Sequence, residues 1–302
     1  MVRPVNFYFN AETAKNNFYQ KNEGDFTVQS ANELAEREFD DFLEQLQSNG
    51  INVIVVDDLL DPETPDSIFP NNWVSFHQDG RVGLYPMFAE NRRLERRTDI
   101  LEMLRSEGYE INEIVDLTEA EEEGRFLEGT GSMVLDRVNK LAYAALSLRT
   151  DKAELEQFCD AFGYEAVPFV ANQSVEGQRL PIYHTNVMMH VGDKYAVLCA
   201  DTIDDKEEKN LVISKLEKSG KEVILISEEQ KNNFAGNMLQ LNNHKGEKFT
   251  IMSTAAYNSL DVGQLNKLKN FGGIIHSSLT TIEQLGGGSA RCMMAEMFLP
   301  QK

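Results

Sequence analysis

The sequence is short of cysteine, of basic residues and of long apolar runs, and each shortage excludes a class of protein. Its 302 residues include three cysteines and no CxxC pair, which excludes a disulfide framework and a zinc cluster of the usual spacing. There are 29 Lys and Arg against 49 Asp and Glu, and the resulting net charge of −20 disfavours nucleic-acid binding. No stretch approaches the roughly 18 apolar residues of a membrane span. We therefore expect no nucleic-acid partner, no membrane partner and no metal.

What remains is an ordinary globular composition, with 41% hydrophobic and 26% charged residues. The length suits one large domain or two small ones, and we expect a single domain spanning residues 1–302. The segment Met1–Phe9 lacks the apolar core and the cleavage site of a signal peptide. A cytoplasmic location with reduced thiols is the resulting expectation.

Short apolar runs rich in β-branched residues alternate with helical patterns, so we expect an α/β fold. The recurring outline is a hairpin, a helix and a strand, at a period of roughly 50 to 60 residues. Hairpins are expected at 73–85, 132–146 and 186–198, helices at 31–47, 92–107, 152–162, 205–219 and 257–271, and further strands at 52–57, 166–170, 222–226, 249–252 and 273–275. A circular arrangement of such units would bring hairpin ends together at one central site. A doubly wound sheet is the competing architecture, because α/β alternation alone does not exclude it.

Cys292 is the first candidate for chemistry, since a thiolate is the strongest nucleophile among ordinary side chains. It follows the glycine-rich segment Gly286–Gly288, which permits close backbone approach to a small substrate. The neighbouring Arg291 carries a charge that favours thiolate. A buried apolar cysteine is the alternative interpretation, and we expect it for Cys159 and Cys199, which lie in apolar helix and strand patterns.

His184 and Glu128 are the next candidates, and both stand where polar residues adjoin an apolar run. His184 begins the polar triplet His184–Asn186, which enters an apolar strand pattern, and Glu128 precedes Gly129-Thr130-Gly131. A structural histidine and a surface acid in a plain turn are the alternatives. A lone GxG without a P-loop lysine is a weak phosphate signal. A thiol, an imidazole and a carboxylate together are the parts of a nucleophilic hydrolase.

Glu in EGxG, His in HxN and Cys after GGG, in this chain order, resemble the guanidine-modifying superfamily. This superfamily includes arginine deiminase, agmatine deiminase, dimethylarginine hydrolase and amidinotransferases. Within it, the segments Arg3–Phe7, Pro65–Trp73 and Asn91–Arg97 look most like the bacterial citrulline utilization hydrolases. The resemblance implies a five-bladed α/β propeller of ββαβ units, the pentein fold, with pseudo-fivefold symmetry and no cofactor. It also implies a nucleophilic Cys292, a general acid/base His184, and a Glu128 that binds the substrate nitrogens and orients the histidine.

Two departures from the superfamily pattern bear on the substrate. Relatives that act on arginine commonly carry aspartates where this chain has Asn72 and Asn186. A guanidinium is a cation with N–H donors only, so carboxylates suit it. A ureido group is neutral and its oxygen accepts hydrogen bonds, so carboxamides suit it better. We therefore expect a small-molecule ureido substrate, with citrulline hydrolysed to ornithine, ammonia and CO2.

Further substrate contacts are expected from Arg92, which would bind an α-carboxylate, and from Asp66, Phe69 and Asn71, which would shape the site. For the arginines of 92–97, a salt-bridged helix face is the alternative. Two other functions stay open: a guanidine deiminase, dihydrolase or amidinotransferase acting on arginine, agmatine or a derivative, and an amino-acid-binding sensor without turnover. The acidic surface is compatible with a homodimer.

Overall fold

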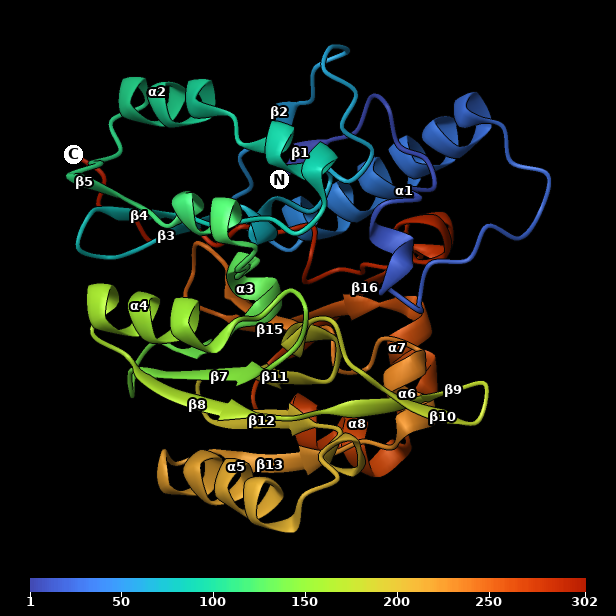
Figure 1. The fold of residues 1–302 in the computed structure, drawn as a ribbon, viewed down its shortest axis with the longest axis vertical. Coiled ribbons are helices and arrows are strands. Elements are labelled where there is room, and N and C mark those ends of the chain that lie inside the picture. Colours follow the sequence, from blue (N-terminus) through green and yellow to red (C-terminus); the bar gives the residue numbers. More distant parts are fainter.

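The computed structural model describes residues 1–302 and shows a mixed α/β fold of six small β-sheets with helices packed around them (Figure 1). Four of the sheets have three strands each and share one strand order. They are formed by β3 (Val74–Phe76), β4 (Arg81–Leu84) and β5 (Glu113–Asp116); β6 (Val134–Asp136), β7 (Leu141–Ala145) and β8 (Glu165–Phe169); β11 (Met189–Val191), β12 (Tyr195–Leu198) and β13 (Glu222–Leu225); and β14 (Leu239–Asn242), β15 (Lys248–Ser253) and β16 (Gly273–Ser277).

In each of these sheets the first two strands form an antiparallel hairpin and the third returns parallel to the second. A parallel neighbour needs a crossover connection, and helices provide it. They are α2 (Thr98–Ser106), α4 (Lys152–Phe162), α5 (Lys206–Lys218), and the pair α7 (Thr254–Ser259) and α8 (Val262–Lys269). The hairpin–helix–strand outline predicted from the sequence is therefore confirmed.

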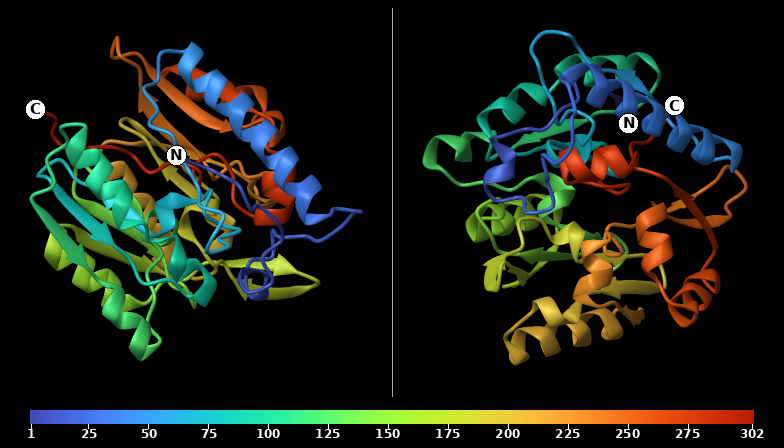
Figure 2. Two further views of the ribbon diagram at one scale, coloured as in Figure 1. Left: turned by 90° about the horizontal axis from the view of Figure 1, so that it is seen from above. Right: turned by 90° about the vertical axis from the view of Figure 1, so that its right-hand side faces the viewer.

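The N-terminal region repeats this outline in a shorter form. Strand β1 (Val2–Arg3) pairs in parallel with β2 (Val56–Asp57), and α1 (Val28–Ser48) lies between them in the chain. Figure 2 shows α1 lying along the C-terminal sheet, beside β16. One additional hairpin, of β9 (Asn172–Val175) and β10 (Gln178–Pro181), extends from the body of the molecule (Figure 1). Two short helices, α3 (Gly129–Ser132) and α6 (Glu228–Asn232), complete the set used below.

Three predicted elements are wrong in extent. The strand predicted at 52–57 is reduced to β2, which finds only the short β1 to pair with. The helix predicted at 92–107 is a 3-10 helix at Glu90–Glu95 followed by α2, because the backbone is extended at Arg96 and Arg97. The helix predicted at 257–271 is interrupted at Leu260, after which the Asp261 side chain caps α8. Strands β1, β5, β9, β10 and β14 were not predicted.

The core forms where the sheets and helices bury their apolar faces. In α4 the residues Leu155, Phe158, Cys159 and Phe162 recur at helical spacing and are buried. Cys199 is buried in the largest apolar cluster, so the structural interpretation of Cys159 and Cys199 is confirmed. No helix combines the length and the apolar character that crossing a bilayer requires.

Candidate active site

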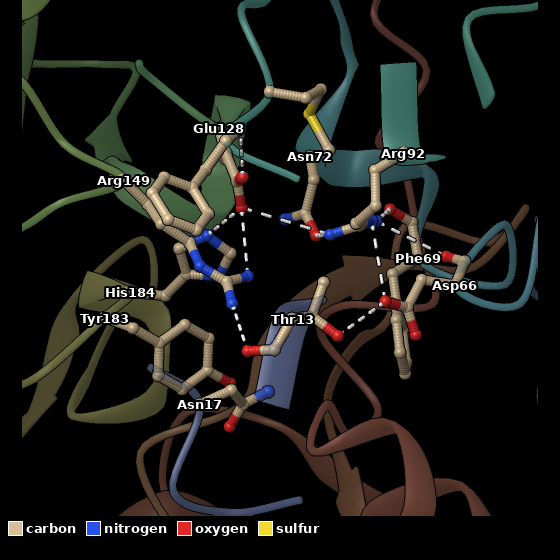
Figure 3. A network of polar contacts seen from close by, with 12 residues as sticks. Thr13, Asn17, Asp66, Phe69, Asn72, Arg92, Glu128, Arg149, Tyr183 and His184 are labelled. Carbon is tan, nitrogen blue, oxygen red and sulfur yellow. Dashed lines mark hydrogen bonds and ion pairs between the residues drawn. The ribbon is translucent and has the colours of Figure 1, made fainter. Parts of the chain in front are cut away.

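A narrow cavity collects most of the residues selected from the sequence. Its volume is about 10 Å³, roughly the room that one water molecule needs. Twelve residues line it: Thr13, Asn17, Asp66, Phe69, Asn72, Arg92, Arg149, Tyr183, His184, Gly286, Gly288 and Cys292. The residues labelled in Figure 3 converge from segments that lie far apart in the sequence. The cavity therefore depends on the tertiary fold, and no single segment supplies it.

The EGxG segment forms α3, and both of its glycines are required by close neighbours. A Cβ at Gly131 would lie 2.4 Å from the Asn72 Nδ2 and 2.8 Å from the His184 Cε1. Gly129 has a φ of +46°, and a Cβ there would lie 2.3 Å from the backbone oxygen of Asn71. The absence of side chains at these positions lets α3 bring Glu128, Asn72 and His184 together.

The triple glycine ends a turn of π-helix at Ile282–Gly286 and lies against Phe69. A Cβ at Gly286 or Gly288 would come within 2.9 Å of the Phe69 ring. Gly287 has a φ of +65°, which a side chain rarely adopts, and its carbonyl accepts a hydrogen bond of 2.7 Å from the Tyr183 hydroxyl. The glycines thus allow the chain that leads to Cys292 to pack directly against Phe69.

His184 and Glu128 form a buried pair, with 2.7 Å between Nε2 of the imidazole and Oε2 of the carboxylate. Burial lowers the pKa of His184 to about 4, although Glu128 acts in the opposite direction. The imidazole is therefore neutral near pH 7. Because an ionised carboxylate only accepts hydrogen bonds, the proton lies on Nε2 and Nδ1 is left as the basic nitrogen.

Two buried arginines hold Glu128 in its charged form. Nη1 of Arg149 lies 3.4 Å and Nη1 of Arg92 lies 3.9 Å from Oε2 of Glu128. Burial alone would favour the neutral acid, yet Arg149, His184 and Arg92 hold the pKa of Glu128 far below its usual range. The backbone N–H of Phe88 donates to the other oxygen at 2.9 Å. Glu128 is thus a fixed anion behind the imidazole.

The sulfur of Cys292 faces two carboxamides. Nδ2 of Asn237 lies 3.3 Å and Nδ2 of Asn186 lies 3.5 Å from Sγ, and all three residues are buried. The Oδ1 of Asn186 has no hydrogen-bond partner, although it is buried. An unpaired buried acceptor at this place is available to an N–H donor of a ligand.

Asn72 is held by its neighbours in one orientation. Its Oδ1 accepts a hydrogen bond of 2.7 Å from Nη1 of Arg92, and its Nδ2 donates to Oδ1 of Asn71 at 3.1 Å. A guanidinium has donors only, so the carbonyl oxygen of Asn72 must point to Arg92. The amide nitrogen, which carries a second N–H, then points toward Gly131 and His184. This arrangement fixes the orientation of the Asn72 amide and leaves one of its N–H groups without a protein partner.

A family model described as "N,N dimethylarginine dimethylhydrolase, eukaryotic" matches residues 3–299. The chain belongs to this family. The resemblance to the guanidine-modifying superfamily is therefore confirmed at the level of the superfamily. The comparison with curated proteins gives no match.

Solved structures of the same fold include three kinds of protein. The N-terminal domain of ArgZ, covalently bound to a reaction intermediate, is 16% identical, with a TM-score of 0.74 over 99% of this chain and 98% of that chain. AgrE in complex with ornithine and NAD+ is 18% identical, with a TM-score of 0.75 over 100% of this chain and 39% of that chain. A dimethylarginine dimethylaminohydrolase adduct with S-methyl-L-thiocitrulline is 14% identical, with a TM-score of 0.60 over 87% of this chain and 88% of that chain. ArgZ is described as an arginine dihydrolase from the ornithine-ammonia cycle in cyanobacteria.

Most of the residues predicted from the sequence meet in or beside the cavity of this family member. Asp66, Phe69, Asn72, Arg92, His184 and Cys292 line it, Glu128 adjoins it through His184, and Asn186 adjoins it through Cys292. Asn71 lies behind Asn72 and bonds to it. Asp66 accepts hydrogen bonds from Asn10 and Thr13 through Oδ2, while its Oδ1 has no partner.

The two arginines proposed as charges near the substrate already have protein partners. Nε and Nη2 of Arg92 bind Glu95 at 2.8 and 2.9 Å, so a substrate carboxylate would have to displace one of its contacts. The guanidinium of Arg291 binds Glu296 at 2.9 Å and the Met294 carbonyl at 2.8 Å. Its backbone N–H donates to Asn237, whose amide contacts the thiol.

Arg149, Tyr183 and Asn237 were missed as site residues. Arg149 follows the β7 hairpin with no motif around it, and it contacts Glu128, Asn16 and the ring of Tyr183. Asn237 follows a glycine in a loop and carries no sequence signal of its own. The structure contains no cluster of three or more His, Cys, Asp or Glu residues suited to holding a metal ion.

Proposed function

We propose that this protein is a cysteine-dependent hydrolase of C–N bonds that cleaves the ureido group of citrulline. The observation that carries the proposal is the orientation of Asn72. Its carbonyl oxygen is turned to Arg92 and one N–H is bound to Asn71, so the group that the amide can offer to a ligand beside His184 is its second N–H. A ureido oxygen accepts such a donor, whereas the N–H groups of a guanidinium do not.

Asn186 supports the same substrate class from the side of the thiol. Its unpaired Oδ1 is an acceptor for one N–H group, and as a carboxamide it adds no charge to the site. A carboxylate at either position would repel a ureido oxygen. A neutral planar group with one acceptor and several donors matches the two amides together.

The mechanism follows from the groups around the cavity. The thiol of Cys292 loses its proton to His184, and the sulfur adds to the ureido carbon, whose C=O bond becomes an oxyanion. Asn72 and Asn186 are the amide donors available to that oxyanion. The imidazolium, stabilised by Glu128, gives its proton to the leaving nitrogen, the C–N bond breaks, and a thiocarbamate on Cys292 remains.

Water completes the reaction in the second half. Neutral His184 takes a proton from a water molecule, the hydroxide adds to the thiocarbamate carbon, and the sulfur leaves as the thiolate. The carbamic acid that results decomposes to CO2 and an amine. The net change is citrulline and water giving ornithine, ammonia and CO2, and it holds whichever nitrogen leaves first.

Hydrolysis of arginine is the second candidate, and the comparisons favour it. The chain has the fold of ArgZ, an arginine dihydrolase, and matches a family described by an arginine derivative. Two successive hydrolyses of a guanidinium pass through a urea, so the two candidates share the second reaction. A sensor without turnover is less well supported, because thiol, imidazole and carboxylate converge on one cavity region.

The same proposal extends to the architecture. We infer a five-bladed propeller with pseudo-fivefold symmetry, in which the four three-stranded sheets are complete ββαβ blades and the β1–α1–β2 segment is an abbreviated fifth. The single domain, the cytoplasmic location and the homodimer stay predictions.

The test is a panel of citrulline, arginine, agmatine and dimethylarginine, with ammonia and, for dimethylarginine, methylated amines measured for the wild type and for Cys292→Ala. The proposal predicts ammonia from citrulline, none from the variant, and little or none from arginine. Ammonia from arginine with none from citrulline would reject the ureido substrate. Ammonia from both would support the dihydrolase.

A further inference from the structure

Cys292 has no cationic side chain against its sulfur. The guanidinium of Arg291 is bound to Glu296 and to the carbonyl of Met294. His184, with its pKa lowered to about 4 by burial, is uncharged near neutral pH. The side chains that donate hydrogen bonds to the sulfur are two neutral amides, and Asn237 provides the nearer contact.

The orientation of the Asn237 carboxamide is set by two neighbours that leave no choice. Its Oδ1 accepts a hydrogen bond of 3.0 Å from the backbone N–H of Arg291, which can only donate. Its Nδ2 donates at 3.0 Å to the backbone carbonyl of Asn186, which can only accept. A flipped amide would break both bonds, so it is an N–H group that faces the sulfur.

The backbone around Asn237 adopts an unusual path to make this approach. Phe234 has a φ of +62°, uncommon for a bulky residue, and its ring packs 5.0 Å from that of Tyr19. A Cβ at Gly236 would lie 2.5 Å from the carbonyl oxygen of Val187. Such strain is retained when the surrounding contacts fix it, and here it holds Asn237 against Cys292.

We propose that Asn237 is a catalytic residue that stabilises the thiolate of Cys292 through an N–H···S hydrogen bond. The bond strengthens when the thiol proton moves to His184, because an ionised acceptor binds a donor more strongly. It forms again when the sulfur is expelled from the thiocarbamate. This inference deepens the proposed function, since a neutral ureido group brings no positive charge that would stabilise the thiolate.

The test is the rate of alkylation of Cys292 by iodoacetamide as a function of pH, followed by mass spectrometry of the modified peptide. Asn237→Ala is expected to react about tenfold more slowly near neutral pH, the loss typical of one hydrogen bond to a charged group, and to reach half its maximal rate at a higher pH. Asn233→Ala, in the same loop, removes an exposed amide that donates to the Glu229 carbonyl, and it is expected to match the wild type. Coincident profiles of Asn237→Ala and wild type would overturn the proposal.

A second variant, Asn237→Asp, keeps the shape of the side chain and the acceptor for the Arg291 N–H, but it removes the donor at the sulfur. Its half-maximal alkylation rate is expected at a higher pH than that of the wild type, and a coincident midpoint would overturn the proposal. Burial raises the pKa of Cys159 and of Cys199 to about 12, so neither thiol contributes to the alkylation rate near neutral pH. Because iodoacetamide is no substrate, this result stands even if the substrate panel rejects citrulline, and the two failures are distinguishable.

Discussion

The imidazole of His184 and the carboxylate of Glu128 are hydrogen-bonded at 2.7 Å, and both side chains are almost wholly shielded from solvent. Near neutral pH the carboxyl group of Glu128 is ionised and the imidazole of His184 is neutral. When His184 accepts a proton, the adjacent anion stabilises the imidazolium, so Glu128 sets how readily the histidine acts as a base.

Replacing Glu128 with glutamine keeps the shape of the side chain and removes its charge. We expect kcat to fall about a hundred- to ten-thousandfold, the range typical of lost general acid–base catalysis. The measurement is kcat on the best substrate of the panel, together with the melting temperature, because Arg149 also loses a partner. Glu119→Gln, an exposed change, is the control. A Glu128→Gln enzyme with wild-type kcat would contradict the role.

Stability should fall as the pH is lowered below about 6.5, because three histidines are buried in neutral form. Burial lowers the pKa of His77 to about 3, of His184 to about 4 and of His190 to about 3. Between these values and 6.5 the unfolded chain binds more protons than the folded chain, so acid favours unfolding. Glu95 and Glu283 have the opposite effect on stability, because burial raises the pKa of each carboxyl to about 7. Their contribution to the free energy of unfolding is lost as the pH rises through that value.

His77→Gln isolates one of these contributions outside the site. His77 stacks on Phe162 and bonds to Ser75. We expect the melting temperature of the variant to fall less between pH 6.5 and 4 than that of the wild type, because glutamine does not titrate. Thermal denaturation across this range checks it, and parallel curves would show that His77 is not held neutral by the fold.

Gly131→Ala tests whether the close approach of α3 is needed for activity. The added Cβ would meet Asn72 and His184, so kcat/KM should fall at least about a hundredfold, as is typical when reacting groups are displaced by about 1 Å. Gly263→Ala in the exposed α8 should leave activity unchanged. Equal kcat/KM values for the two variants would argue against the positioning role of Gly131.

Substrate preference should respond to charge at the two asparagines. In Asn72→Asp the bond to Arg92 is kept, but the second oxygen becomes an acceptor where a donor stood. We expect kcat/KM for citrulline to fall about a hundredfold or more, and the ratio of arginine to citrulline turnover to rise. Asn186→Asp should change this ratio in the same direction. If the ratio is unchanged in both variants, the two asparagines do not determine the preference for a ureido substrate.

The sequence was sufficient for the residues that carry motifs and insufficient for those that only the tertiary fold brings near. Glu128 and Cys292 stand beside glycines, and His184 begins a polar triplet before an apolar strand pattern. These local signals were enough to select the three residues as candidates. Asn237 could not, because its contact with Cys292 depends on a loop that packs at Gly236 against the distant 3-10 turn Thr185–Val187. Local pattern thus indicated the candidate reacting groups but not the residues that hold them in place.

The helix predicted at 92–107 illustrates the same limit. Its apolar and charged residues have helical spacing, but Arg92 and Glu95 are drawn inward as a buried ion pair. A 3-10 turn with an extended exit accommodates that burial, and a periodicity argument has no access to it. Short strands such as β5 and β14 were missed because partner strands, more than their own composition, define them.

The most direct measurement follows the ureido carbon itself. Citrulline labelled with ¹³C at that position is incubated with the wild type and with Cys292→Ala, and labelled CO2 and ornithine are quantified. We expect equal amounts of labelled CO2 and ornithine from the wild type and neither product from Cys292→Ala. Label that stays in citrulline while the same enzyme preparation hydrolyses arginine would contradict this expectation.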